Sequence, residues 1–171
     1  MLIWALDLAT QMGWASGEPG GTLTYGSVRL SREGGDEFDI GASALRFLGE
    51  HWIAFLPDVV VIEAPMNSAQ AGKMTNARTQ LILQGLYFQC GSMARRLGVP
   101  RVTVANVQTV RKHFVGQGRP QNPKRAVMDR CRLLGFKPQD DNAADAIALW
   151  DYAASILSPR AAHVNTALFR R

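Results

Sequence analysis

The sequence predicts an α/β domain, and three patterns support that prediction. Two apolar runs, residues 2–7 and 58–63, each end in a single acidic residue, as buried strands do when they present a charged group at the edge of a sheet. Between residues 82 and 97 apolar side chains recur every three or four positions, which indicates a long amphipathic helix. A further strand-forming run, residues 101–105, follows that helix, so a helical crossover would join two parallel strands.

The first 30 residues predict three antiparallel strands joined by short turns. The first strand ends at Asp7, which should lie at the sheet edge because burying an ionised carboxylate inside a strand would cost several kcal/mol. A second strand follows near residues 13–17, and a Pro-Gly-Gly turn at residues 19–21 separates it from a third, residues 22–30.

A loop and a helix are expected next. Residues 31–41 are polar and rich in glycine, which favours a loop. Apolar side chains at helical spacing then run up to a Pro57-Asp58 stop: Leu45, Leu48, Trp52 and Phe55. His51 lies among them, and we expect it to be a packed or half-exposed helix residue rather than a ligand.

The second half of the chain alternates loops and helices. Residues 66–75 are small and polar, so we expect a mobile loop near whatever Asp7 and Glu63 bind. The elements expected after the fifth strand are a loop at 116–123, a helix from Lys124 to Gly135, a connector at 136–140 and a last helix at 141–157. A single domain over residues 1–158 is predicted, followed by a basic tail at 159–171.

Composition narrows the class of protein. The chain has 171 residues and is 47% hydrophobic, which suits one domain with a full core. No apolar run approaches the roughly 18 residues of a membrane span, and the N-terminus lacks the pattern of a signal peptide. We therefore expect a cytoplasmic protein with no membrane contact. Cys90 and Cys131 lack metal-binding spacing and are expected to be reduced core thiols.

Positive charge is concentrated in one span. Between Arg95 and Lys137 eleven Lys or Arg stand against one acid, Asp129, a net charge of +10 in a chain whose total is +5. The basic residues are Arg95, Arg96, Arg101, Arg111, Lys112, Arg119, Lys124, Arg125, Arg130, Arg132 and Lys137. So long a span of one sign predicts a polyanionic partner, above all nucleic acid, although a basic surface that only keeps the protein soluble is the alternative.

Two acids open the last helix. Asp141 and Asp145 are four residues apart, so they lie on one helical face with alanines between them. Two like charges there are tolerated at a solvated helix N-terminus or around a bound cation. Asp141 could instead be the N-cap of this helix. Asp145 lies inside the helix, where capping does not explain it.

The four acids are expected to form one site. Parallel neighbouring strands end at the same edge of a sheet, which would bring Asp7 and Glu63 to the pair on the last helix. Four carboxylates need a compensating cation, and hard oxygen ligands select Mg²⁺ or Mn²⁺. Two such ions, roughly 3.5–4 Å apart, commonly serve attack on a phosphodiester.

These residues together resemble a known family. The sequence has Asp7 followed by Gly13-Trp14-Ala15, Glu63 closing an apolar strand, a Lys124 helix after Gly116-Gln117-Gly118, and an alanine-flanked Asp145. In this order they are similar to the RuvC-type Holliday junction resolvases of the RNase H-like superfamily. The resemblance implies a five-stranded mixed sheet flanked by helices, a homodimer, and Mg²⁺-dependent incision of branched DNA, with two ions per active site and Mn²⁺ able to substitute.

The resemblance also implies roles for individual residues. Asp7, Glu63 and Asp145 match the family's acids, and Lys124 matches a basic residue near the scissile phosphate. Hydrolysis with two ions shared among these acids would leave a 5′-phosphate. The backbone phosphates would be held by Arg111, Lys112, Arg119 and Arg125.

The sequence departs from the family at two places. In bacterial RuvC proteins the fourth acid precedes the last by three positions, where this chain has Asn142. Asp141 could replace it from four positions back, a pattern similar to phage-borne relatives, or Asn142 could serve as a weaker oxygen ligand. The loop after Asp7 has Leu8-Ala9 where the family usually has Pro-Gly.

Two other functions share the same acids. One is a different RNase H-like nuclease, such as a flap or debranching nuclease or an RNase H acting on hybrids. The other is a junction-binding protein with weakened catalysis, because Asn142 occupies a family acid position. If the chain is phage-encoded, the compartment would be the host cytoplasm.

Overall fold

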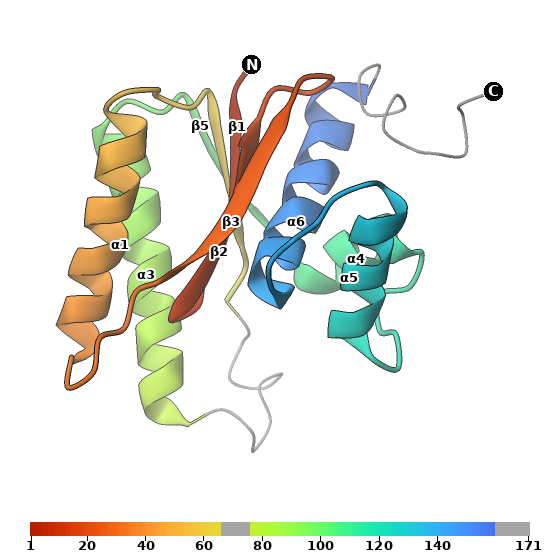
Figure 1. The fold of residues 1–171 in the computed structure, drawn as a ribbon. Coiled ribbons are helices and arrows are strands. Elements are labelled where there is room, and N and C mark those ends of the chain that lie inside the picture. Colours follow the sequence, from red (N-terminus) through yellow and green to blue (C-terminus); the bar gives the residue numbers. More distant parts are fainter. Residues whose placement is uncertain (66–75, 160–171) are drawn as a thin grey trace.

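A mixed β-sheet forms the centre of the computed structural model, which describes residues 1–65 and 76–159. Within these residues five strands are arranged in the order β3-β2-β1-β4-β5 (Figure 1). Their bounds are β1 Ile3–Asp7, β2 Gln11–Gly17, β3 Leu23–Arg29, β4 Val59–Glu63 and β5 Arg101–Ala105. The predicted fold class, an α/β fold with a five-stranded mixed sheet, is confirmed.

Strand pairing explains where the first two acids lie. β1 pairs antiparallel with β2, which pairs antiparallel with β3, as the short turns predicted. β4 pairs parallel with β1, and Leu6 is the register partner of Ile62. The next residue on each strand is Asp7 and Glu63, so both carboxylates leave the sheet at the same edge. β5 is parallel to β4.

Helices cover both faces of the sheet. Their bounds are α1 Glu37–Trp52, α3 Ala77–Arg96, α4 Val107–Val115, α5 Pro123–Leu133 and α6 Asp141–Leu157. α1 and α3 lie side by side over one face, and α6 covers the other with α4 and α5 packed outside it (Figure 1). No helix in the parts of the chain that the structure describes is long and apolar enough to cross a membrane.

Alternation along the buried strands divides the core in two. In β1, Ile3 and Ala5 face the α6 side, whereas Trp4 and Leu6 face α1 and α3. β4 repeats this pattern. Both cysteines are buried free thiols, Cys131 in the first core and Cys90 in the second, which confirms that prediction. Burial raises the pKa of each thiol to about 12.

His51 is packed, as predicted. Its ring lies against Trp4, Trp14 and Phe47, with a centroid distance of 4.3 Å to Phe47. Its Nδ1 lies 2.7 Å from the Phe47 carbonyl oxygen, one helical turn earlier.

The sequence-based boundaries of α1 are wrong at both ends. Residues 31–41 were expected to be a loop, but α1 begins at Glu37, because Asp36 caps it and Asp39 completes a capping box. The helix ends at Trp52, so Phe55 lies beyond it and is 75% exposed instead of buried. The cap was missed because Asp36 lies within a polar and glycine-rich segment, which is also the composition of a loop.

Helix α4 was not predicted. Asn106 caps it by accepting a hydrogen bond from the Gln108 N–H, and Gly116 ends it in a left-handed conformation with φ of 82°. The loop predicted at residues 66–75 lies outside the described residues. The predicted tail does too, apart from its first residue.

Gly13 allows α6 to approach the sheet closely. It pairs with Asp7 across β1 and β2, and a Cβ built at Gly13 would lie far inside van der Waals contact of the Asn142 carbonyl oxygen. Any side chain at this position would displace the first turn of α6, which carries Asp141 and Asp145.

We expect Gly13→Ala to lower the free energy of unfolding by about 1–3 kcal/mol, because the methyl group overlaps backbone that cannot rotate away. Urea unfolding measures this. The control is Gly85→Ala in α3, where an added Cβ meets nothing within 4 Å and should stabilise the helix by about 0.5–1 kcal/mol. A Gly13→Ala protein as stable as the wild type would contradict the close approach.

Candidate active site

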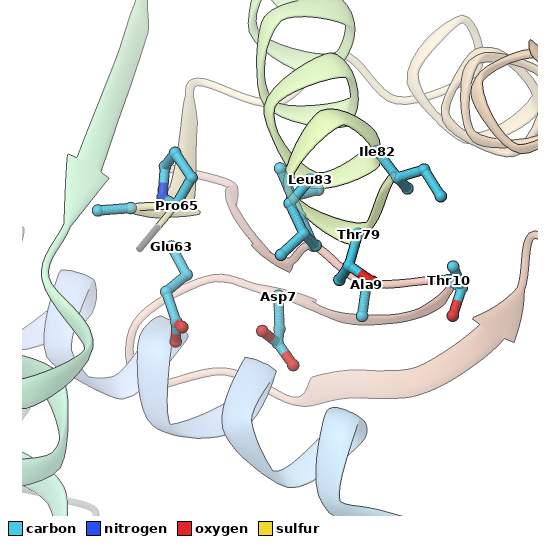
Figure 2. A pocket seen from close by; sticks show the side chains of 10 residues that line it. Asp7, Ala9, Thr10, Glu63, Pro65, Thr79, Ile82 and Leu83 are labelled. Carbon is cyan, nitrogen blue, oxygen red and sulfur yellow. The ribbon is translucent and has the colours of Figure 1, made fainter. Parts of the chain in front are cut away.

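The structure brings the four predicted acids together at one edge of the sheet. Asp7 and Glu63 end the neighbouring parallel strands β1 and β4, and their carboxylates both point toward α6 (Figure 2). Asp141 and Asp145 lie in the first two turns of α6. The charges of Glu63, Asp145 and Asp141 all act on Asp7, so the four carboxylates form one electrostatic cluster.

The start of α6 is fixed by a capping residue that sequence reasoning missed. Asp140 is the N-cap, and its Oδ1 accepts a hydrogen bond of 2.9 Å from the Ala143 N–H. The Ser27 hydroxyl on β3 donates to the other carboxylate oxygen of Asp140. The alternative that Asp141 caps the helix is therefore wrong. The signal was present in the sequence, because an aspartate directly precedes the helix.

Small residues bring α6 against the sheet. Ala143, Ala144, Ala146 and Ala148 are buried to 1% exposure or less. Their lack of bulk lets the helix pack closely against the sheet around Asp145. This close packing also leaves the Asp145 carboxylate poorly solvated.

Burial and mutual repulsion dominate the electrostatics of the cluster. Burial raises the pKa of Glu63 to about 7, with the Asp145 charge adding to the effect. Burial likewise raises the pKa of Asp145 to about 6. The pKa of Asp7 lies well above its ordinary value, first because of burial and then because of Glu63 and Asp145.

Arg111 supplies positive charge to this cluster. It lies on α4, and it lowers the pKa of Asp7, Glu63 and Asp145. The three pKa values stay raised, so its charge does not offset the burial and repulsion. Its buried Nε has no hydrogen-bond partner among the described residues.

Lys124 binds Asp141 directly. Its Nζ forms an ion pair with Oδ2 of Asp141, which lowers the pKa of that carboxyl and raises the pKa of the lysine. The Lys124 side chain is 74% exposed. It also lies near two of the other acids, since the charges of Asp145 and Asp7 raise its pKa as well. α5 places it there: Asn122 caps that helix and Pro123 occupies its first turn.

The donor chemistry of the cluster fits a hard divalent cation. All four groups are carboxylates. The raised pKa values of Asp7, Glu63 and Asp145 mean that their ionised forms are destabilised, and a bound cation would offset this. Among residues 1–65 and 76–159, however, no group of three or more His, Cys, Asp and Glu side chains is arranged to hold an ion. The carboxylates would have to draw closer to bind one.

Asp141 and Asn142 are both near the cluster. The Asp141 charge raises the pKa of Asp7 and of Asp145, so its carboxylate faces the acids. Asn142 packs its backbone carbonyl against Gly13 and is half-buried. The electrostatic coupling favours Asp141 as the fourth acid, and the choice of ligand stays a prediction.

The predicted phosphate-binding residues lie on two helices and on the loop between them. Arg111 and Lys112 are on α4, Arg125 is on α5 and Arg119 lies in the connecting loop. Lys112, Arg119 and Arg125 are exposed. Arg125 also pairs with Asp129 one turn later, at 3.5 Å.

The residues of the basic span lie in more than one part of the fold. Arg101 begins β5 and pairs in register with Val59, whereas the acids leave the sheet beyond Glu63, the register partner of Ala105. Arg95 and Arg96, at the end of α3, lie at the same far edge as Arg101. One strand length therefore separates these three arginines from the basic residues near the acids.

A pocket of about 330 Å³ opens beside the acids. Asp7 and Glu63 form one end of it, and side chains of α3 form the facing wall (Figure 2). The turn Leu8-Ala9, where the resemblance led us to expect Pro-Gly, lines it as well. No described residue other than glycine has a positive φ, so this turn needs no glycine.

The five-stranded mixed sheet with helices on both faces gives the chain a fold similar to that of solved RuvC structures. Two structures of Thermus thermophilus RuvC are similar to the chain. One has 19% identity and a TM-score of 0.62, and the other, in complex with a Holliday junction substrate, has 16% and 0.68. Both matches cover 92% of this chain and 96% of the other.

A third similar structure is the yeast mitochondrial Holliday junction resolvase Ydc2. It has 13% identity and a TM-score of 0.57, and the match covers 86% of this chain and 75% of that one. No protein-family model and no curated protein sequence matches the chain. The resemblance inferred from the motifs is thus confirmed at the level of the fold.

We expect the metal-free protein to lose stability as the pH rises. The folded pKa of Glu63, about 7 against an ordinary 4.5, means that the folded state keeps a proton that the unfolded chain releases, so the unfolding free energy falls across this window. Glu63→Gln removes this loss and should be more stable than the wild type at pH 8 by on the order of 2 kcal/mol.

Urea unfolding at pH 5 and pH 8 in EDTA measures this effect. The control is Glu50→Gln, on the exposed side of α1, which should follow the wild type at both pH values. Equal pH dependence of Glu63→Gln and the wild type would contradict the buried cluster.

Proposed function

We propose that the protein is a metal-dependent, structure-selective DNA endonuclease that resolves four-way junctions by phosphodiester hydrolysis and leaves 5′-phosphates. The observation that carries this proposal is the cluster of Asp7, Glu63, Asp141 and Asp145 beside Lys124. The fold supports it, because one similar structure is bound to a Holliday junction substrate.

The four carboxylates would hold two Mg²⁺ ions, with Mn²⁺ able to substitute. When bound, such ions supply Lewis acidity and lower the pKa of a bound water. Asp7 is central to the cluster, since the charges of the other three act on it. It would therefore be shared, with Glu63 on one side and Asp145 on the other.

The basic side chains act on the phosphate. Lys124 is mostly exposed while paired with Asp141, so its ammonium can also reach a phosphate oxygen and stabilise charge that develops there. Arg111 offsets part of the charge of the acids from α4. Lys112, Arg119 and Arg125 would hold neighbouring backbone phosphates, which gives affinity that falls with salt and carries little sequence information.

Two copies of the chain would act on one junction. A four-way junction has near two-fold symmetry, and a two-fold dimer presents two active sites to two opposed strands. A homodimer is therefore part of the proposal.

A substrate panel tests the proposed function. With Mg²⁺ or Mn²⁺, the wild type should cut a four-way junction in preference to flap, RNA–DNA hybrid and linear duplex substrates of the same sequence. Equal cutting of linear duplex would contradict the junction assignment. Junction binding without cleavage would instead support the junction-binding protein that Asn142 suggested.

Asp7→Asn should lower the cleavage rate by at least about 100-fold and leave junction affinity nearly unchanged, because it removes a carboxylate from the cluster and spares the basic helices. Single-turnover cleavage and gel-shift binding measure the two effects. Glu50→Gln is the control and should behave as the wild type. Wild-type cleavage by Asp7→Asn would mean that the site is misassigned.

A further inference from the structure

The pocket beside the acids has a chemistry that the proposed catalytic residues leave unexplained. Beyond Asp7 and Glu63 it continues along α3, where Thr79, Ile82 and Leu83 face Ala9 and Thr10 (Figure 2). Most of the exposed lining is apolar. None of the described residues that line it is basic.

The described part of this lining offers no basic side chain to a phosphate. Phosphate binding in proteins uses Arg, Lys, backbone N–H groups or a cation, and the basic residues of this site lie on α4 and α5, on the opposite face of the sheet from α3. Apolar walls with a few polar groups at the edges are typical of pockets for flat organic groups. In DNA that group is the base.

We propose that this pocket receives the base of a nucleotide that flanks the scissile phosphate and is unpaired at the junction crossover. The inference rests on the proposed function. The Asp7 and Glu63 end of the pocket is where the phosphate would be attacked, so the base joined to that phosphate through its sugar is the nearest apolar group. Ile82 and Leu83 would contact its face, and the hydroxyl of Thr79 lies at the rim.

Size and energetics both favour a single extruded base. A volume of about 330 Å³ lies at the low end of the ~300–1,000 Å³ found for ligand pockets, a size that suits one base better than a base pair. Extrusion from a duplex costs a few kcal/mol, and least where stacking is already interrupted. The pocket would thus favour cleavage where the crossover has already freed a base.

The test fills the pocket without touching the acids. Leu83→Trp occupies the apolar wall, and Thr79→Trp occupies the rim from an exposed position that packs in no core. The matched control is Leu81→Trp, two residues away on the same helix, 59% exposed and outside the pocket. Unfolding of each variant by urea confirms that it folds.

The first measurement is single-turnover cleavage of junctions whose crossover can occupy several positions. Leu83→Trp and Thr79→Trp should cut at least about 10-fold more slowly than the wild type. Their cuts should also be spread more evenly over the possible crossover positions. Junction affinity should change by less than about 3-fold, because phosphate contacts dominate it. Leu81→Trp should match the wild type in all three respects.

The second measurement needs no cleavage. A junction with 2-aminopurine beside the crossover is bound in EDTA, and an unstacked base in an apolar pocket should fluoresce more strongly and resist quenching by acrylamide. The wild type and Leu81→Trp should show both effects, and the two filled variants neither.

The outcomes separate the two proposals. Normal junction cleavage by the wild type, with Leu83→Trp and Thr79→Trp behaving as Leu81→Trp in both measurements, would overturn the base pocket alone. A wild type that cuts no junction with Mg²⁺ or Mn²⁺ would overturn the proposed function and this inference with it.

Discussion

The burial of several mutually repelling carboxylates is the constraint on which the rest of this structure depends. Asp7, Glu63 and Asp145 have raised pKa values because they share one poorly solvated edge of the sheet. A fold gains nothing in stability from such a cluster, so its occurrence at the ends of two adjacent strands points to chemistry. Arg111 and Lys124 provide the only positive charges that the described residues bring to act on these acids.

The scaffold around the cluster holds these charges in place. Parallel pairing of β1 with β4 aligns two of the acids, and the absence of a side chain at Gly13 brings α6 against them. The hydrogen bond from Ser27 to Asp140 ties the start of α6 to β3. Each of these is a backbone or capping feature, so the geometry of the site depends on rigid elements rather than on loops.

Much of this could be predicted from the sequence. Strand-end acids and the apolar runs before them are local patterns, and they gave the sheet edge and the convergence of Asp7, Glu63 and Asp145. What could not be predicted depends on contacts between distant segments: the hydrogen bond from Ser27 to Asp140 and the division of the basic span between two edges of the sheet. The cap of α6 by Asp140 is a local contact, and it was missed although an aspartate directly precedes the helix. Helix α4 was missed because a nine-residue element shows little periodicity.

The central claim is that these carboxylates exist to hold divalent cations. A crystal structure of the protein with Mn²⁺, using the anomalous signal of the metal, tests it most directly. We predict ions ligated by Asp7 together with Glu63 and Asp145, with Asp141 rather than Asn142 as the fourth side chain. Saturating Mn²⁺ that leaves these carboxylates without an ion would contradict the account.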